Sequence, residues 1–190
     1  ASDRGRNGSP GARLVYDGPA DGKTLLVLQE ESCVSGVRLR GDSVPFAQWP
    51  PRGGPAKATS TICMNVVGAR CEIENCELAR FARGITIAAP RAWIHHNRLL
   101  DIAPYPVCLN VEASSAIIEG NDIGWMWHAI AATYSPLNSY RARNNVFREA
   151  APNRFAEGVS GQFAADAHGL GECFVLDRNT FLHEDPSRSV

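Results

Sequence analysis

Ile94-His95-His96-Asn97-Arg98-Leu99 is the stretch of sequence that decides the fold, because its pattern of apolar-x-x-Asn-x-apolar returns along the chain. The copy at 118–123 follows 24 residues later, and the copy at 142–147 follows after another 24. Further copies occupy 176–181, 73–78 and 34–39, the last two with Cys76 and Val37 in the asparagine position. Repetition at a fixed period of roughly 20–50 residues predicts a stacked, repetitive architecture.

Each repeat predicts two or three short strands. Apolar residues alternate with polar ones inside each copy, and this period of two is typical of a β-strand and not of a helix. A third alternating segment precedes four of the copies, at 64–66, 85–87, 109–111 and 130–132.

A turn of 21 to 24 residues made of short strands, with an asparagine at one corner, resembles the right-handed parallel β-helix superfamily. That superfamily includes pectate-lyase-like enzymes, alginate epimerases and phage tailspikes, and the resemblance covers about residues 25–182. It implies an all-β fold, a right-handed parallel β-helix of about six rungs with an Asn ladder. The ladder is expected to contain Asn97, Asn121, Asn145 and Asn179, whose amides both donate and accept. We expect one domain over 11–190 and a disordered segment over 1–10, which is rich in Gly, Arg and Ser.

The distribution of charge supports this register. Stacked copies place equivalent outward residues about 4.8 Å apart, so like charges are expected to avoid one another. One predicted outward row contains Glu74, His95, Glu119, Arg143 and Asp177, and the other contains Arg38, Glu77, Arg98, Asp122, Val146 and Thr180. Neither row places two like charges side by side.

The same alignment predicts the core and the state of the cysteines. The two apolar columns are Val34, Ile73, Ile94, Ile118, Ala142 and Leu176, and Leu39, Leu78, Leu99, Ile123, Phe147 and Phe181. Cys71 and Cys76 are expected inside, and Cys63 and Cys108 outside, two rungs apart. That separation is about 9–10 Å, too long for a disulfide, and we predict none.

Composition excludes several classes of partner. The net charge is -1, and no block of basic residues indicates binding to nucleic acid or to a membrane surface. No apolar run reaches the roughly 18 residues of a membrane span. No signal peptide is visible, but the chain starts at Ala1-Ser2-Asp3, which fits removal of one. We expect a secreted or cell-surface protein, with the periplasm included.

The resemblance also implies where a ligand binds. Members of the superfamily that act on glycans commonly bind them along one strand face, and the matching outward row here is Asn65, Thr86, Asn110 and Ala131. Trp125, Trp127 and Tyr105 are the aromatic residues expected to contact a sugar beside that row. The alternative is that one of the two tryptophans packs beneath a loop.

Candidate catalytic residues lie near the same face. His128 or Tyr134 is the expected base for removing the proton α to a uronate carboxyl group, and Arg83, Arg91 or Arg154 is the expected cation on that carboxylate. Glu112 is a candidate for an acid or a metal ligand, and each of these residues has a purely structural interpretation as well. Neighbouring strand residues point to opposite sides, so His95-His96 is not expected to bind a metal. We predict no cofactor and no metal ligands, with calcium left open.

Two functions follow from these patterns. The first is a carbohydrate-active β-helix protein, lyase- or epimerase-like, that acts on or binds an acidic polysaccharide. The second is a non-catalytic glycan-binding or structural module of a larger surface or spike protein. Open ends of a solenoid also leave room for oligomerisation.

Overall fold

The protein is all-β over the part of the chain that the computed structural model describes, which is 12–16, 23–41, 61–102, 105–125, 128–133, 135–149, 163–168 and 171–182. At 125, 133, 149, 163, 164 and 166–168 only the backbone is described. The expected disordered segment 1–10 lies outside these ranges, as do Trp127 and Tyr134. No helix within these ranges is long and apolar enough to cross a membrane.

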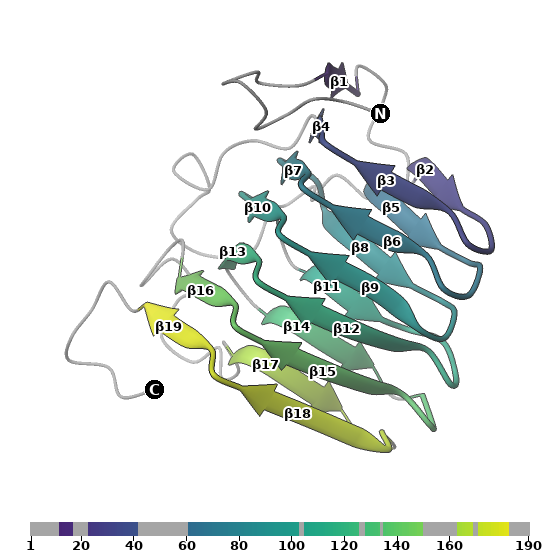
Figure 1. Ribbon diagram of the computed structural model, residues 1–190, viewed down its shortest axis with the longest axis vertical. Coiled ribbons are helices and arrows are strands. Elements are labelled where there is room, and N and C mark those ends of the chain that lie inside the picture. Colours follow the sequence, from purple (N-terminus) through teal and green to yellow (C-terminus); the bar gives the residue numbers. More distant parts are fainter. Residues whose placement is uncertain are drawn as a thin grey trace.

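The strands form three parallel sheets (Figure 1). Sheet A contains β1 (Ala12–Val15), β4 (Val37–Arg40), β7 (Glu77–Ala79), β10 (Arg98–Leu100), β13 (Asp122–Trp125), β16 (Val146–Glu149) and β19 (Thr180–Leu182). Sheet B contains β2 (Thr24–Leu28), β5 (Ile62–Val66), β8 (Arg83–Ile87), β11 (Tyr105–Leu109), β14 (His128–Thr133) and β17 (Phe163–His168). Sheet C contains β3 (Cys33–Ser35), β6 (Glu72–Glu74), β9 (Ala92–His95), β12 (Ser115–Glu119), β15 (Ser139–Arg143) and β18 (Cys173–Asp177).

The chain visits the three sheets in turn. It passes from β5 in sheet B to β6 in sheet C and β7 in sheet A, and β8 then pairs with β5 in sheet B. Successive passes therefore stack, and in Figure 1 the colours run in order down the long axis. This solenoid-like arrangement is consistent with a parallel β-helix.

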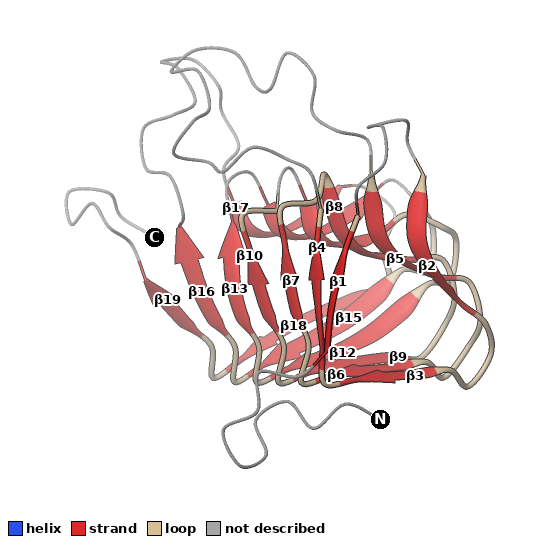
Figure 2. Cartoon of the chain, turned by 90° about the horizontal axis from the view of Figure 1, so that it is seen from above, coloured by secondary structure: helices blue, strands red, loops and turns tan. Residues whose placement is uncertain are grey.

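The predicted register of the core is confirmed. In sheet C, Ile73 pairs with Ile94, Ile94 with Ile118, and Ile118 with Ala142. The predicted column of sheet A pairs in the same way, from Leu39 to Phe181. The three sheets surround a common interior (Figure 2), and the column side chains of the middle strands are almost fully buried.

A repeated turn joins sheet C to sheet A. The residue before each asparagine position has a positive φ, and these residues are Gly36, Asn75, His96, Gly120, Asn144 and Arg178. The left-handed conformation turns the chain sharply, and glycine and asparagine tolerate it best.

Asparagine side chains connect these turns. Asn97 Nδ2 donates to Asn121 Oδ1, Asn121 Nδ2 to Asn145 Oδ1, and Asn145 Nδ2 to Asn179 Oδ1, each at 3.0 Å. Each amide also donates to a carbonyl of the preceding strand in sheet C. The amide groups thus satisfy one another in a buried position, where an unpaired polar group is costly.

The predicted register of sheet B was wrong at one strand. Thr86 pairs with Cys108 and not with Asn110, which follows the end of β11. The segment at 103–106 reads as an insertion in the sequence, but the strand already begins at Tyr105. Both 107–109 and 109–111 fit apolar-x-apolar, so the pattern alone does not distinguish them.

The cysteines are buried more than predicted. Cys71 and Cys76 lie inside as expected, but Cys63, which was expected outside, belongs to the hydrophobic core, and Cys108, which pairs with Thr86, is buried too. All six cysteines lie within the described part of the chain and are thiols.

Candidate functional site

A groove runs along the outer face of sheet C, across four of its strands. Its lining comes from alternate outward residues of β9, β12, β15 and β18, together with the start of each strand. The lining residues are Arg91, Ala92, Trp93, Ser115, Ala116, Ile117, Ser139, Tyr140, Arg141, Cys173 and Val175.

A column of three apolar residues and one arginine forms the floor of this groove. Trp93 pairs with Ile117, Ile117 with Arg141, and Arg141 with Val175, so these residues form one outward column along the stack. Trp93 is 42% exposed and Ile117 is 43% exposed. An exposed aromatic ring beside exposed aliphatic side chains is unusual on a soluble surface and indicates a binding face.

Two arginines add positive charge to the groove. Arg91 is exposed at the start of β9, and its backbone N–H donates to Ser115 Oγ at 2.8 Å. The Arg141 side chain is 52% exposed and forms a long ion pair of 3.4 Å with Asp177. Guanidinium groups bind carboxylates with paired N–H donors, so the groove offers an apolar floor with sites for anionic groups.

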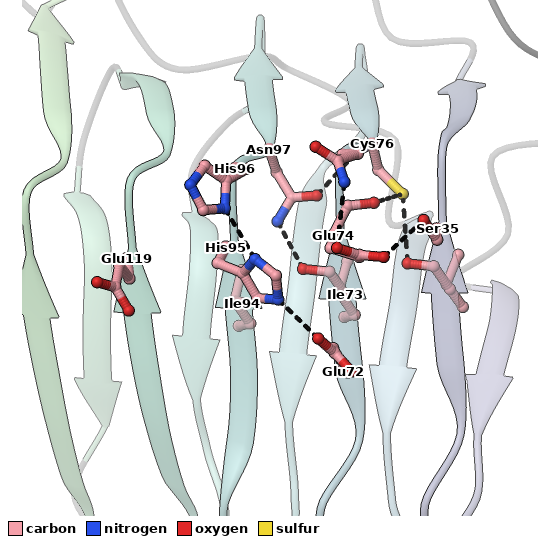
Figure 3. Close-up of polar contacts among 12 residues, drawn as sticks. Ser35, Glu72, Ile73, Glu74, Cys76, Ile94, His95, His96, Asn97 and Glu119 are labelled. Carbon is pink, nitrogen blue, oxygen red and sulfur yellow. Dashed lines mark hydrogen bonds and ion pairs between the residues drawn. The ribbon is translucent and has the colours of Figure 1, made fainter. Parts of the chain in front are cut away.

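A chain of polar contacts links Glu72, His95 and His96 (Figure 3). His95 Nε2 is 2.8 Å from Glu72 Oε1, and His95 Nδ1 is 2.9 Å from His96 Nδ1. The rings of Trp93 and His95 have centroids 4.0 Å apart and are inclined by 31°. Only 5% of His95 is exposed, so this ring supports one side of the tryptophan.

The expectation that His95 and His96 face opposite sides was wrong. His95 ends β9, but His96 adopts a φ of 55° in the turn, and strand alternation does not extend to it. The register of the predicted charge row is confirmed, since His95 pairs with Glu74 and with Glu119. However, the His95 ring contacts Glu72 and is buried, so it is not an exposed member of that row.

An ion pair continues this row toward the C-terminal strands. Arg143 Nη2 donates to Glu119 Oε2 at 2.8 Å across the strand pair β12–β15. This hydrogen bond lowers the pKa of Glu119, and the positive charge of Arg143 acts in the same direction against the smaller, opposite effect of desolvation.

Three of the predicted site residues meet at the start of the strands of sheet B. Tyr105 stacks on His128 with centroids 5.8 Å apart and an interplanar angle of 8°, and the Arg83 guanidinium lies 5.9 Å from the Tyr105 ring. His128 is only 3% exposed. Glu112 lies beyond the other end of β11, in an exposed turn, and does not join this group.

The predicted substrate row on sheet B is largely closed. Thr86 is 2% exposed and Ala131 is fully buried, while Asn65 is half-buried. Asn110 does not belong to the row. The side chain of Trp125 lies outside the described residues, as do Trp127 and Tyr134.

The sequence analysis missed the groove on sheet C. Its signal was the large apolar residue between two core positions, as in Ala92-Trp93-Ile94 and Ala116-Ile117-Ile118. In a strand with confirmed inward neighbours, such a residue must face outward. Comparison of the chain with protein-family models, curated proteins and solved structures gives no match.

Proposed function

We propose that this chain is a right-handed parallel β-helix that binds an acidic polysaccharide in the groove on sheet C. The observation that carries the proposal is the exposed column of Trp93 and Ile117, with Arg91 and Arg141 in the same groove. Binding to an extracellular polysaccharide would place the protein outside the cell or on its surface.

The proposed fold rests on the stacking of successive turns. The hydrogen bonds between the four asparagines support an Asn ladder along one corner. Connections between parallel strands of one sheet are right-handed in nearly all proteins, which favours the right-handed form.

The chemistry of the groove fits an anionic sugar chain. The C–H face of a pyranose ring packs on an aromatic ring such as Trp93, and the neighbouring arginines match a carboxylate or sulfate group. The column continues across strands spaced about 4.8 Å apart, so an extended ligand contacts several of them together.

The groove favours binding over turnover. Among the described residues that line it there is no carboxylate and no imidazole, which are the groups most often used in general acid–base catalysis. Of the weaker candidates in the lining, Tyr140 is almost fully buried and Cys173 is exposed. The sequence-predicted base, His128, lies on sheet B and is buried. The proposed function is therefore the non-catalytic, glycan-binding one.

Affinity electrophoresis through gels that contain alginate, polygalacturonate or a neutral glucan tests the proposal. We expect an acidic polymer, but not the neutral one, to retard the migration of the protein. This retardation is expected to weaken as salt is added, because salt screens ionic contacts. Trp93→Ala is expected to weaken binding about tenfold, because stacking and apolar burial together contribute about 1.5 kcal/mol. Arg141→Gln is expected to reduce the salt dependence.

Matched variants locate the site. Arg98→Gln makes the same charge change on an exposed side chain of sheet A and is expected to leave binding unchanged. His128→Ala tests the alternative on sheet B. Unchanged binding by Trp93→Ala together with loss by His128→Ala would refute the proposed groove, and retention by no acidic polymer would refute the function. Release of unsaturated uronates would show a lyase instead.

A further inference from the structure

We propose that Glu72, Glu74 and His95 form a binding site for a divalent transition-metal ion, with zinc as the expected ion. The three residues lie on strands β6 and β9 of sheet C (Figure 3), and the His95 ring packs against Trp93. It is separate from the groove lining and does not depend on polysaccharide binding.

The donor atoms are already close to the spacing of metal ligands. One carboxylate oxygen from each glutamate and one ring nitrogen of His95 all lie within 4.8 Å of one another. His95 Nε2 and Glu72 Oε1 are 2.8 Å apart. Ligands about 2.0–2.2 Å from a tetrahedral zinc ion lie roughly 3.3–3.6 Å from each other. A movement of less than about 1 Å between Glu72 Oε1 and His95 Nε2 therefore makes room for the ion.

Contacts outside the three ligands hold them in place. Ser35 Oγ donates to Glu74 Oε1 at 2.8 Å, and Asn75 Nδ2 donates to Glu74 Oε2 at 3.1 Å. His95 is held between the Trp93 ring and His96. Hydrogen bonds from a second layer of residues orient metal ligands in this way and tune their affinity.

The contact between the two histidines orients the His95 ring. His95 Nδ1 lies 2.9 Å from His96 Nδ1, and on the other side of the ring His95 Nε2 lies 2.8 Å from Glu72 Oε1. Metal-ligating histidines are commonly oriented by a contact of their second ring nitrogen, which leaves the first nitrogen directed at the ion.

Charge also favours a cation at this position. Among the described residues, neither Glu72 nor Glu74 forms an ion pair with an arginine or lysine, although arginines neutralise Glu119 in β12 and Asp122 in β13. Two carboxylates close together carry a charge of about -2, which a divalent ion cancels.

The donor set favours zinc over calcium or magnesium. Calcium and magnesium take oxygen ligands almost exclusively, whereas imidazole nitrogen with carboxylate oxygen suits zinc. Three protein ligands leave a position for water or another ligand, as in zinc sites that are open to solvent. The Trp93 side of the site faces the groove.

The test is a zinc titration of the chelator-treated protein against a chromophoric competitor. It is done in a Cys33→Ser/Cys173→Ser background, because Cys33 and Cys173 are exposed and thiols are themselves ligands for zinc. We expect one zinc per chain with a Kd of about 1 µM or below, and a rise in the thermal unfolding midpoint with zinc. Cobalt is expected to give the visible absorption of a low-coordinate site.

Variants decide which residues bind. Glu74→Gln and His95→Gln are each expected to weaken zinc binding at least tenfold. Glu77→Gln, three residues further along the chain at the start of β7 in sheet A, is expected to leave zinc binding unchanged. His95 is buried, so circular dichroism is used to check that His95→Gln is folded. If that variant is unfolded, the result for Glu74→Gln, at a half-buried position, decides the test. Absence of binding in the thiol-free background refutes the proposal, as does binding that both variants leave intact. Polysaccharide retardation measured in parallel, with and without zinc, reports separately on the proposed function.

Discussion

Removal of the Asn121 amide is the sharpest test of the stacked architecture. Its Oδ1 accepts from the backbone N–H of Asn97 at 2.9 Å and from Asn97 Nδ2 at 3.0 Å. Its Nδ2 donates to the carbonyl of Ile94 at 2.9 Å and to Asn145 Oδ1 at 3.0 Å. Asn121→Ala thus removes four hydrogen bonds from a side chain that is almost fully buried.

The expected loss of stability follows from these four contacts. A typical hydrogen bond contributes about 1 kcal/mol net, and an orphaned buried donor costs about 1–3 kcal/mol. The Asn97 backbone N–H loses its acceptor, whereas Asn145 Oδ1 keeps the backbone N–H of Asn121 at 3.0 Å. We therefore expect Asn121→Ala to lower the free energy of unfolding by about 3–5 kcal/mol, or roughly 10 °C in the unfolding midpoint.

Urea unfolding followed by circular dichroism measures this loss, with two variants for comparison. Asn179→Ala removes three bonds at a less buried position and is expected to cost less. Asn110→Ala removes an amide whose oxygen has no hydrogen-bond partner in the described part of the chain, and is expected to cost under about 1 kcal/mol. Equal losses for Asn121→Ala and Asn110→Ala would refute the reasoning.

Two further predictions concern ionisable groups. Only Cys33 and Cys173 are exposed, so native protein is expected to react with Ellman's reagent at two thiols. Partial burial and the charges of Glu72 and Glu74 raise the pKa of Cys33, so its reaction is expected to accelerate with rising pH. Four or more fast-reacting thiols would contradict the burial of the other four cysteines. Arg143 holds the pKa of Glu119 below its ordinary value of about 4.5, so the pair stabilises the fold above that value and ceases to do so as pH falls through the lowered pKa. In chelator-containing buffer, the stability difference between wild type and Glu119→Gln is expected to be present at pH 7 and to vanish in acid, and a difference independent of pH would exclude the ion pair as its cause.

The sequence was sufficient to predict sheets A and C. Their strands are joined by a short turn of nearly constant length, and the asparagine marks the same point in most repeats. Once Asn97, Asn121 and Asn145 are aligned, every inward and outward position on both sides follows from alternation. The core columns of these two sheets pair as predicted for that reason.

Sheet B was less predictable because its connection from sheet A varies in length. The distance along the chain from Leu100 to the start of β11 differs from that between other repeats, and no residue type marks where the strand begins. Val107 and Leu109 are both suitable core residues for the same position, so a shift of two keeps the alternation intact. The predicted alignment therefore placed Asn110 in the row that Cys108 occupies in the structure.

The polar cluster of sheet C was hidden by a single backbone conformation. In an extended strand His95 and His96 would point to opposite faces, and the sequence gives no direct sign that His96 leaves the strand. However, His96 occupies the position before Asn97, and the equivalent residues Gly120 and Asn144 are types that tolerate a positive φ. If the turn conformation of those copies is applied to His96, both imidazoles lie on one side of the strand. They are then next to Glu72 and Glu74, which the predicted register already aligned with β9. The same alignment that predicts the core therefore also contains the geometry of the cluster, provided that the turn conformation is carried from repeat to repeat along with the strands.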